Sequence, residues 1–450
     1  MFLFLVLCSA VNLSLPQAES LAVVYSSEIQ SAHHQVLSAH TQYRAEVLKF
    51  FPKAGITAYL PTVTYSQEEV NYPPYPNPID YWKRTEQGIV TVDVSMLLPV
   101  GGNVSVSYDL TKVNEISNLY EDERYYQSSL TFNISQPLWG SISPYSSIRT
   151  GNNTYLKSVR NYHRTTRNVL RNLRSYYIDL YIYQRVYQHV DTMVKLAQRQ
   201  IDEIDYLYQQ GYVDDIELLQ NEGKLGLMIL KGMEIESEIN QLKDKINLII
   251  GIDQFNLIEP EIPEFNGEIN PDIWFELQDI QAELEDINQQ INDNRRENGP
   301  SLEVSGYYGF RGREEEVQAM YEEFRKNRWG VSVGISIPLI DLPARRQVQS
   351  LEHLRDAYRE RENSYRRELI IEIARIKSEK EKLLVKLQLA RTTFLASEKV
   401  FLQSSVLDLS ASEQLEILED YTDAMEYYGS VLKELYLLDL FFEREGRGQD

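Results

Sequence analysis

The sequence predicts a mostly helical protein with a membrane β-barrel portion, organised as two repeats in which strands are followed by a very long helix. The segment Ile134–Leu138, with the sequence ISQPL, returns as ISIPL in Ile335–Leu339. Each copy closes a run with a period of two residues, and each leads into a helical pattern of about sixty residues. Strands with small residues on one face, joined to helices of this length, favour a barrel continued by a coiled helical tube.

Residues 1–10 are predicted to be a secretory signal. Met1 to Cys8 are all apolar, and Ser9 and Ala10 provide the small residues that signal peptidase needs. The run is short and lacks a basic beginning, so we expect the true start to lie upstream. The alternative is lipid attachment at Cys8, but Leu7 is large where a lipoprotein signal has a small residue.

Composition excludes several classes of function. The net charge of −22, from 67 acidic and 45 basic residues, argues against nucleic acid as a partner. The single cysteine leaves no internal disulfide or cysteine-based metal site, and no apolar stretch is long enough for a transmembrane helix. Adjacent His33 and His34 point in different directions on a helix and read as polar surface. No phosphate loop, zinc motif or nucleophile elbow is found, so we expect neither an enzyme nor a cofactor.

The first repeat, residues 11–251, is expected to begin with a helix over residues 16–51. Pro52 and Gly55 end this helix, and apolar residues alternate with polar ones from Ile56 onward, which predicts a first strand. Residues 65–83 are rich in Tyr, Pro and Asn and are interpreted as an irregular loop.

A hairpin over residues about 89–110 follows, because two alternating runs flank the turn Pro99–Asn103. A polar, acidic loop is expected at residues 114–124. The run Leu130–Ser135 then forms the strand that leads to Pro137. The hairpin makes the first repeat longer than the second and is interpreted as an extra element of that copy.

The long helix of the first repeat is predicted over Ser147–Gln210. Its apolar positions repeat at alternating spacings of three and four residues, with Thr166 as the one polar member, which is the pattern of a coiled coil. At 1.5 Å per residue such a helix reaches roughly 96 Å. Gly211 ends it, and a second helix is expected from Asp214 to Ile250.

A linker over residues 252–271 separates this repeat from the second, which covers residues 272–443 and leaves a polar tail at 444–450. The second repeat is expected to contain a helix, two strands, a long helix over Arg345–Ser405 and a last helix from Ser412 to Phe442. Gly211 lies 74 residues after Pro137, and the same distance from Pro338 reaches Ser412. The two long helices are therefore expected to turn at the same level.

The run Trp329–Leu339 has large apolar residues on one face and only Gly, Ser and Pro on the other. A barrel strand in a bilayer shows this pattern, although a strand of a soluble sandwich also alternates. So few strands cannot close a barrel alone, so we expect a homo-oligomer embedded in membrane lipid. Trp139 and Trp329 at strand ends are typical of a membrane interface.

Several motifs, in this order and spacing, resemble the TolC-type outer membrane efflux protein family. They are Leu13–Glu19, the strand ends Ser135–Leu138 and Ser336–Leu339, the break Gly211–Asp214 with Ile216–Gln220 after it, and Leu248–Gly251. The resemblance implies a homotrimer whose chains each give four strands to a 12-stranded barrel in the outer membrane. It also implies a coiled-coil α-barrel in the periplasm, and export together with a periplasmic adaptor and an inner membrane pump.

Two departures from the family pattern are visible in the sequence. The second break, residues 407–412, lacks the glycine that the family often has there. The hairpin at 89–110 is additional to four strands, and it either extends outside the barrel or packs on it.

The resemblance also suggests where partners and ions bind. The helix breaks at Gly211, Tyr212, Val213, Asp214 and at Asp408, Leu409, Ser410 would form a periplasmic tip that docks the adaptor, or would simply be helix turns. Glu416 and Glu419 share a helix face, with Glu217 at the matching level of the first repeat, and would form an acidic ring at the tunnel entrance. The alternative is a solvated helix face. Pro137 and Pro338 would mark the junction of barrel and helix, because proline cannot donate to a β-ladder.

The function expected from the sequence is therefore a passive export duct of the outer membrane. The competing reading is a coiled-coil scaffold or tether of the cell envelope that forms no channel. A scaffold has no need for Gly and Ser to alternate with Val and Ile beside a proline in both repeats.

Overall fold

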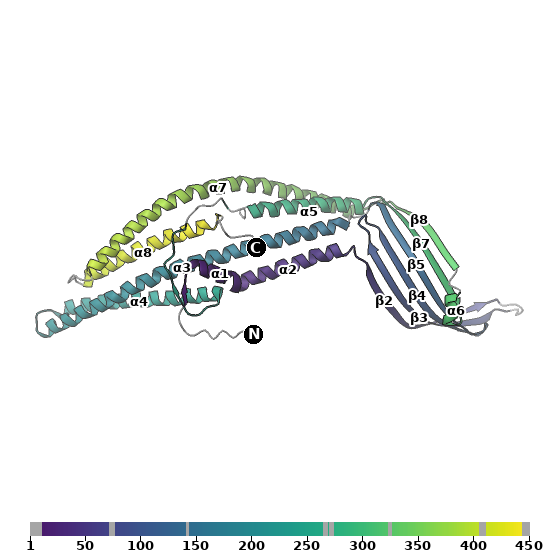
Figure 1. Ribbon diagram of the computed structural model, residues 1–450, viewed down its shortest axis with the longest axis horizontal. Coiled ribbons are helices and arrows are strands. Elements are labelled where there is room, and N and C mark those ends of the chain that lie inside the picture. Colours follow the sequence, from purple (N-terminus) through teal and green to yellow (C-terminus); the bar gives the residue numbers. More distant parts are fainter. Residues whose placement is uncertain are drawn as a thin grey trace. The chain divides into compact units, whose positions relative to one another are not determined.

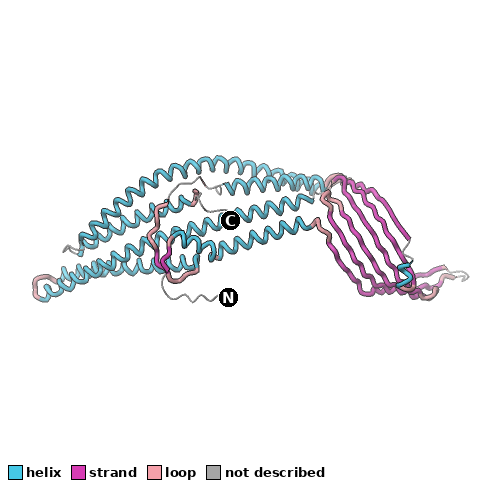
Figure 2. The backbone as a smooth tube through the Cα atoms, viewed as in Figure 1, coloured by secondary structure: helices cyan, strands magenta, loops and turns pink. Residues whose placement is uncertain are grey.

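The computed structural model describes residues 11–71, 77–140, 144–263, 269, 274–322, 326–404 and 411–442. The chain divides into two compact units. Unit 1 comprises Met1–Ser38, Leu156–Asp279 and Glu362–Asp450, and unit 2 comprises Ala39–Tyr155 and Ile280–Arg361. The long strands, magenta in Figure 2, belong to unit 2, whereas most of the helical length belongs to unit 1.

Unit 2 contains a single six-stranded sheet with the strand order β2-β3-β4-β5-β7-β8, in which every neighbouring pair is antiparallel (Figure 1). The strands are β2 (Lys53–Val70), β3 (Ile79–Leu97), β4 (Asn103–Ser117), β5 (Glu123–Trp139), β7 (Ser301–Glu314) and β8 (Lys326–Ser336). A short helix α6 (Val317–Glu322) lies between β7 and β8. We call the end at which helices enter and leave this sheet its helix-side end.

The sheet corrects three expectations from the sequence. The segment interpreted as a loop at residues 65–83 is mostly paired, with Val70 opposite Ile79. The expected loop at 114–124 shrinks in the same way, because Glu115 pairs with Glu123. The hairpin at 89–110 is neither outside nor packed on the sheet, because β3 and β4 are interior strands with a partner on each side. The described sheet thus contains six strands of one chain, where the resemblance implied four.

Four helices join the helix-side end of this sheet. They are α2 (Ser27–Leu48), α3 (Pro144–Gln209), α5 (Phe275–Glu297) and α7 (Leu342–Ser404). With 66 and 63 residues, α3 and α7 confirm the two long helices predicted from the coiled-coil spacing. Unit 2 holds the sheet-side parts of these helices, where Asn153 of α3 donates to Asp286 of α5 at 2.8 Å.

Unit 1 is held by one hydrophobic core that runs between helices. Its other helices are α1 (Leu15–Tyr25), α4 (Asp215–Ile250) and α8 (Ala411–Asp439). Ser26 interrupts what the sequence predicted as one helix over residues 16–51. The strands β1 (Val11–Leu13) and β6 (Phe255–Leu257) form a small parallel pair, so part of the predicted linker is a strand.

The middle of α3 is buried on more than one side. The predicted stripe contributes Leu173, Leu180 and Val190, but Ile178 and Met193, which lie off that stripe, are also fully buried. A helix that packs against neighbours on two sides needs a second apolar stripe, and α3 has one. Gly429 of α8 permits one such approach, because a Cβ there would lie 2.6 Å from the Ile182 side chain.

Candidate channel wall and tip

The six-stranded sheet presents one continuous apolar face. Because side chains alternate along a strand and the register keeps the apolar positions of neighbouring strands in phase, they gather on one side. We call this side the apolar face; it includes Ile56, Val90, Val92, Val94, Val104, Val106, Tyr108, Leu130, Phe132, Ile134, Val304, Tyr308, Trp329, Val331, Val333 and Ile335. Val331 and Ile335 are each 70% exposed. Soluble proteins rarely expose so large an apolar surface, whereas lipid covers one favourably.

The opposite side of the sheet, which we call the polar face, carries Ser, Thr, Gly, Asn and Asp. Thr91 and Ser129, from the two strands beside β4, donate to the Asp109 carboxylate at 2.7 and 3.1 Å. Ser305 and Ser332 are hydrogen-bonded at 2.7 Å between β7 and β8. Such a face requires water, so the two faces suit different solvents.

The apolar face stops part-way along the strands. Beyond Val90 and Leu110, the same side of β3 and β4 continues with Gly88, Glu86 and Lys112. The apolar stretch in each strand is therefore about seven to nine residues, close to the length of about nine that a tilted strand needs to cross a bilayer. The remaining, polar ends of the strands lie away from the helices.

The two prolines lie near the ends of their strands. Pro338 follows the last residue of β8 by two positions, as expected for a residue that ends pairing. Pro137 lies inside β5 opposite Glu303, and pairing resumes after a register shift with Trp139 opposite Leu302. Pairing therefore continues two residues beyond Pro137, where the sequence led us to expect its end. An irregularity in the ladder accommodates the missing N–H of the proline.

The first helix break is a compact turn with an exposed surface. Gly211 adopts a left-handed conformation with φ of +78°, and the N–H groups of Gly211 and Tyr212 bond back to Tyr208 and Leu207. This is the glycine-ended helix terminus that a left-handed residue permits. Asp214 then caps α4 by accepting a hydrogen bond from the Glu217 N–H at 2.9 Å. Tyr212 is 80% exposed, so the turn offers an aromatic side chain to solvent.

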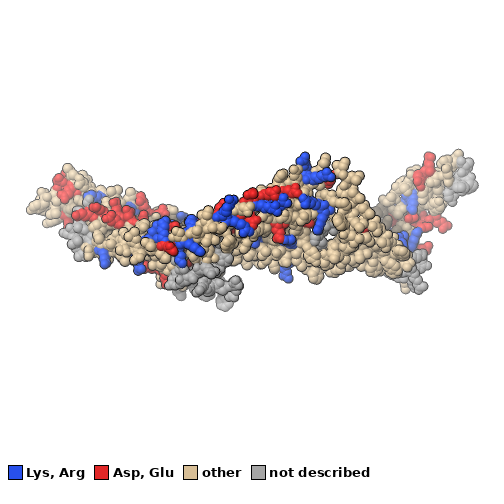
Figure 3. Space-filling model, turned by 90° about the horizontal axis from the view of Figure 1, so that it is seen from above, with Lys and Arg blue, Asp and Glu red and all other residues tan. Residues whose placement is uncertain are grey.

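The second break lies outside the described residues, which include none of Asp408, Leu409 and Ser410. Just after it, Glu416 and Glu419 are exposed on α8, and Glu217 is exposed on α4. Asp423 and Glu426, which the sequence reasoning did not single out, continue the same exposed stripe at spacings of four and three residues. We call Glu416, Glu419, Asp423 and Glu426 the acidic stripe of α8. By contrast, Lys and Arg side chains gather near the start of α7, on the face of the molecule that Figure 3 shows.

A buried ion cluster, which the sequence reasoning missed, lies among α1, α3 and α8. The Arg174 side chain is 2% exposed and donates to Glu19 at 2.6 Å, to Asp439 at 3.0 Å and to the Tyr436 carbonyl at 2.6 Å. Buried charges are tolerated when they are paired and hydrogen-bonded in this way. Glu19 lies in the motif that carried the resemblance, but nothing in the sequence placed Arg174 beside it.

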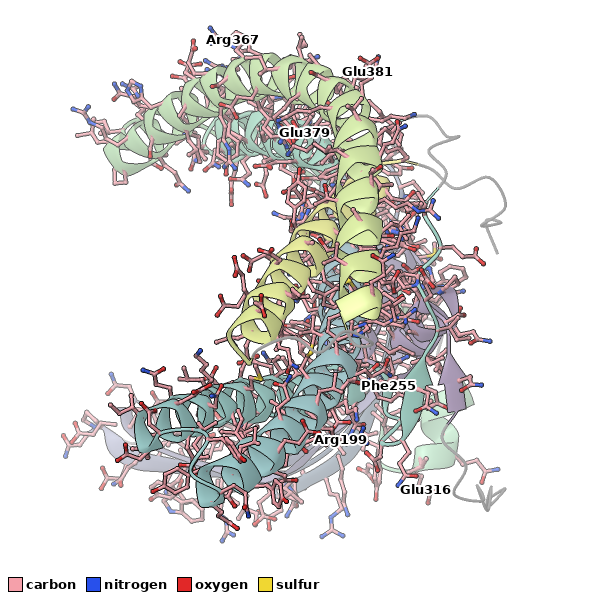
Figure 4. The ribbon with its side chains drawn as sticks, turned by 90° about the vertical axis from the view of Figure 1, so that its left-hand side faces the viewer. Arg199, Phe255, Glu316, Arg367, Glu379 and Glu381 are labelled. Atoms are coloured by element: carbon pink, nitrogen blue, oxygen red, sulfur yellow. The ribbon has the colours of Figure 1, made fainter. Side chains whose placement is uncertain are left out.

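Tyr177, one helical turn after Arg174, anchors the small parallel sheet of unit 1. Its hydroxyl lies 2.7 Å from both the Leu13 and the Ile258 carbonyl oxygens. Burial raises the pKa of Tyr177 to about 12. Figure 4 shows Phe255 of β6 beside the helices of this unit.

An aromatic cluster joins α3, α7 and α8 and lies closer to the two helix breaks than the ion cluster does. The His189 ring meets the rings of Phe401 and Tyr421 edge to face, with centroids 4.4 and 4.3 Å apart. Desolvation, with a smaller contribution from Arg185, lowers the pKa of His189. Burial raises the pKa of Tyr421. Both shifts favour the neutral forms, so the cluster works as apolar packing.

No helix among the described residues is long and apolar enough to cross a membrane. Within those same residues, no group of three or more His, Cys, Asp and Glu side chains is arranged to hold a metal ion.

Comparison with solved structures places the fold. Comparison of the sequence with protein-family models and with curated proteins gives no match. The CmeC outer membrane channel of Campylobacter jejuni is similar in structure, with a TM-score of 0.65 at 14% identity over 96% of this chain and 86% of that one. The MtrE outer membrane channel of Neisseria gonorrhoeae, in its open state, gives 0.62 at 12% identity over 95% and 88%.

The outer membrane protein VceC of Vibrio cholerae gives a TM-score of 0.59 at 12% identity over 95% of this chain and 94% of that one. The resemblance to the TolC-type family is therefore confirmed at the level of the fold. At these identities the likeness establishes the fold alone.

Proposed function

We propose that the chain is one subunit of an export channel in the outer membrane. The observation that carries this proposal is the sheet, in which a continuous apolar face backs a face of Ser, Thr and Asp side chains. Lipid would cover the first face and water would fill the space behind the second. The shared fold with CmeC, MtrE and VceC, two of which are described as outer membrane channels, supports the same assignment.

In this proposal the channel is a passive duct built by three copies. A chain with two edge strands needs neighbours to close a barrel, and long helices from each copy would continue the wall into the periplasm. The duct is proposed to bind no substrate tightly, because the polar face carries mostly small side chains. Direction and energy come from an inner membrane transporter, to which a periplasmic adaptor connects the duct.

The tips are the part of the chain proposed to meet the adaptor. The turn at Gly211 to Asp214 presents exposed Tyr212 between two helices, and exposed loops held by a scaffold often carry recognition. The second break, with Asp408, Leu409 and Ser410, is proposed to dock in the same way. Glu416, Glu419 and Glu217 are proposed to ring the entrance, where carboxylates attract cations.

The competing function is a coiled-coil scaffold or tether that forms no channel. The extent of the apolar face argues against it, because a tether in water would bury or lose such a surface.

Fractionation and conductance separate the two functions. The channel predicts recovery in the outer membrane fraction, a heat-modifiable trimer on mildly denaturing gels, and stepwise conductance in planar bilayers. Recovery as a soluble monomer, or an outer membrane trimer that conducts no ions, would overturn the export role.

A further inference from the structure

The sheet of unit 2 has two free edges of opposite direction. β2 and β8 are its outermost strands, so each has one side without a partner strand within the described sheet. β2 runs away from the helix-side end and β8 runs back to it, because six is an even number of antiparallel strands. If β8 of one copy lies beside β2 of the next, the new pair is antiparallel as well. The head-to-tail contact therefore repeats the pattern of every pair inside the sheet.

The register of the sheet supplies the stagger that closure requires. One row of paired residues crosses all six strands as Lys53, Ser95, Ser105, Asn133, Tyr307 and Gly330. Lys53 starts β2 at the helix-side end, but Gly330 lies six residues before Ser336, the helix-side end of β8. The strand ends are thus offset by about 20 Å across one sheet. This row passes five strand spacings, and a sixth spacing, to the next copy, brings the width to about 29 Å, so the offset corresponds to a tilt of about 35°. Closed barrels have tilts of this size.

We propose that β8 of each copy pairs with β2 of its neighbour, and that the barrel closed in this way has eighteen strands. The tilt is the same for any number of copies paired in this way, so the count of eighteen rests on the trimer of the proposed function. Each copy contributes six strands because β3 and β4 are integral to the sheet.

Side-chain alternation fixes which residues meet at this contact, which we call the β2–β8 seam. Residues of the apolar face must oppose each other, and both strands end at the helix-side end. Ser336 then lies opposite Lys53 of the next copy, which places Val333 opposite Ile56 and Ser332 opposite Thr57. The seam ends near Pro61, where β2 carries a register shift and lacks an N–H donor.

The strand count sets the width of the pore. At 35° tilt, eighteen strands give a backbone diameter of about 33 Å, against about 22 Å for twelve. The polar face adds mostly small side chains, among them Gly309, Gly330, Gly334 and Ser332. The barrel would therefore pass hydrated solutes wider than a single helix, including polypeptides, and the size limit of the duct would lie in its helical part.

Disulfide trapping tests the seam. In a Cys8→Ser background, Thr57→Cys combined with Ser332→Cys should give covalently linked dimers and closed trimers on oxidation, visible on a denaturing gel without reductant. The matched control, Thr57→Cys with Val333→Cys, puts the two thiols on opposite faces and should leave more than nine-tenths of the chain monomeric on that gel. Cross-linking in the control pair with none in the first pair would overturn the register.

Native mass and projection images test the strand count. Detergent-solubilised protein should have about three times the mass of one chain, and end-on electron microscopy images of the barrel should show a wall about 33 Å across. A dimer, or a wall about 22 Å across, would overturn the eighteen-stranded barrel. Trapped trimers with the expected width but no conductance would support the seam and the strand count while overturning the export role.

Discussion

Arg174 Nε donates to Glu19 Oε1 at 2.6 Å between two side chains that are almost completely buried. Asp439 completes the cluster from α8, so α1, α3 and α8 are joined by one guanidinium group. The planar fork of arginine suits this task, because it can serve two carboxylates and a carbonyl at once.

Arg174→Met is expected to destabilise the protein by about 3–5 kcal/mol, because two carboxylates would remain buried without their cation. Chemical unfolding followed by helical circular dichroism measures this change. The matched control is Arg171→Met, one turn earlier on the exposed side of α3. A triple variant, Arg174→Met with Glu19→Leu and Asp439→Leu, should recover most of the loss. Equal unfolding of Arg174→Met and Arg171→Met would contradict a structural role of the cluster.

Tyr177 is expected to make stability fall at alkaline pH. Its pKa rises from 10.0 when unfolded to about 12 when folded, so between those values only the unfolded state loses the proton. Stability is therefore intact below pH 10 and decreases as pH rises toward 12, by about 2–3 kcal/mol from this residue.

The comparison of the native chain with Tyr177→Phe isolates this contribution from the other tyrosines. Tyr177→Phe should be less stable at pH 8 by about 1–2 kcal/mol, because the carbonyls of Leu13 and Ile258 lose their donor. It should also lose less stability between pH 10 and 12. Parallel pH profiles of the two proteins would refute the assignment.

The two faces of β8 are expected to respond oppositely to charge. Val333→Arg places a cation on the apolar face and should cost about 2–4 kcal/mol in a bilayer, seen as trimers that dissociate at lower temperature. Ser332→Arg, one residue away on the polar face, should keep the heat-resistant trimer and shift ion selectivity toward anions. If both variants lost the trimer to the same extent, the sheet would not face lipid on one side and water on the other.

The acidic stripe of α8 is expected to control cations at the tunnel entrance. Glu416→Gln with Glu419→Gln should lower the cation-to-anion permeability ratio and weaken block by divalent cations, because two rings of charge are removed. Planar bilayer recordings measure both quantities. Glu381→Gln is the matched control, since this residue projects from the outer side of α7 (Figure 4). Unchanged ion selectivity in the double variant would mean that the acidic stripe is only a solvated helix face.

The long helices could be predicted from the sequence because each keeps a coiled-coil spacing over many turns. The helix-side halves of the strands could be predicted equally well, since apolar residues alternate with polar or small ones from Val90 to Met96 and from Val331 to Ile335. The far ends of β2 and β3 were not predicted, because their residues are polar on both faces and carry no period of two. Only the structure shows that these ends are paired, for example Tyr65 of β2 with Arg84 of β3.

The buried cluster was beyond sequence reasoning for a different reason. Arg174 stands beside Leu173 in the stripe of α3, and an arginine next to a core position usually reaches solvent. Its partners Glu19 and Asp439 lie more than 150 and 260 residues away along the chain. Only the packing of α1 and α8 on α3 reveals that all three side chains are enclosed. The acidic stripe shows the same limit, since Asp423 joins Glu419 only once the exposed side of α8 is known.

The β3–β4 hairpin starts and finishes at the end of the sheet that lies away from the helices. An insertion of this kind leaves the direction of β2 and β5 unchanged, so the helices on either side keep their places. Each added hairpin widens a threefold assembly by six strands without altering its helical wall. The diameter of the barrel can thus change without a change in the helical tunnel. Gene segments that encode hairpins could be exchanged between such proteins to engineer channels of a chosen diameter.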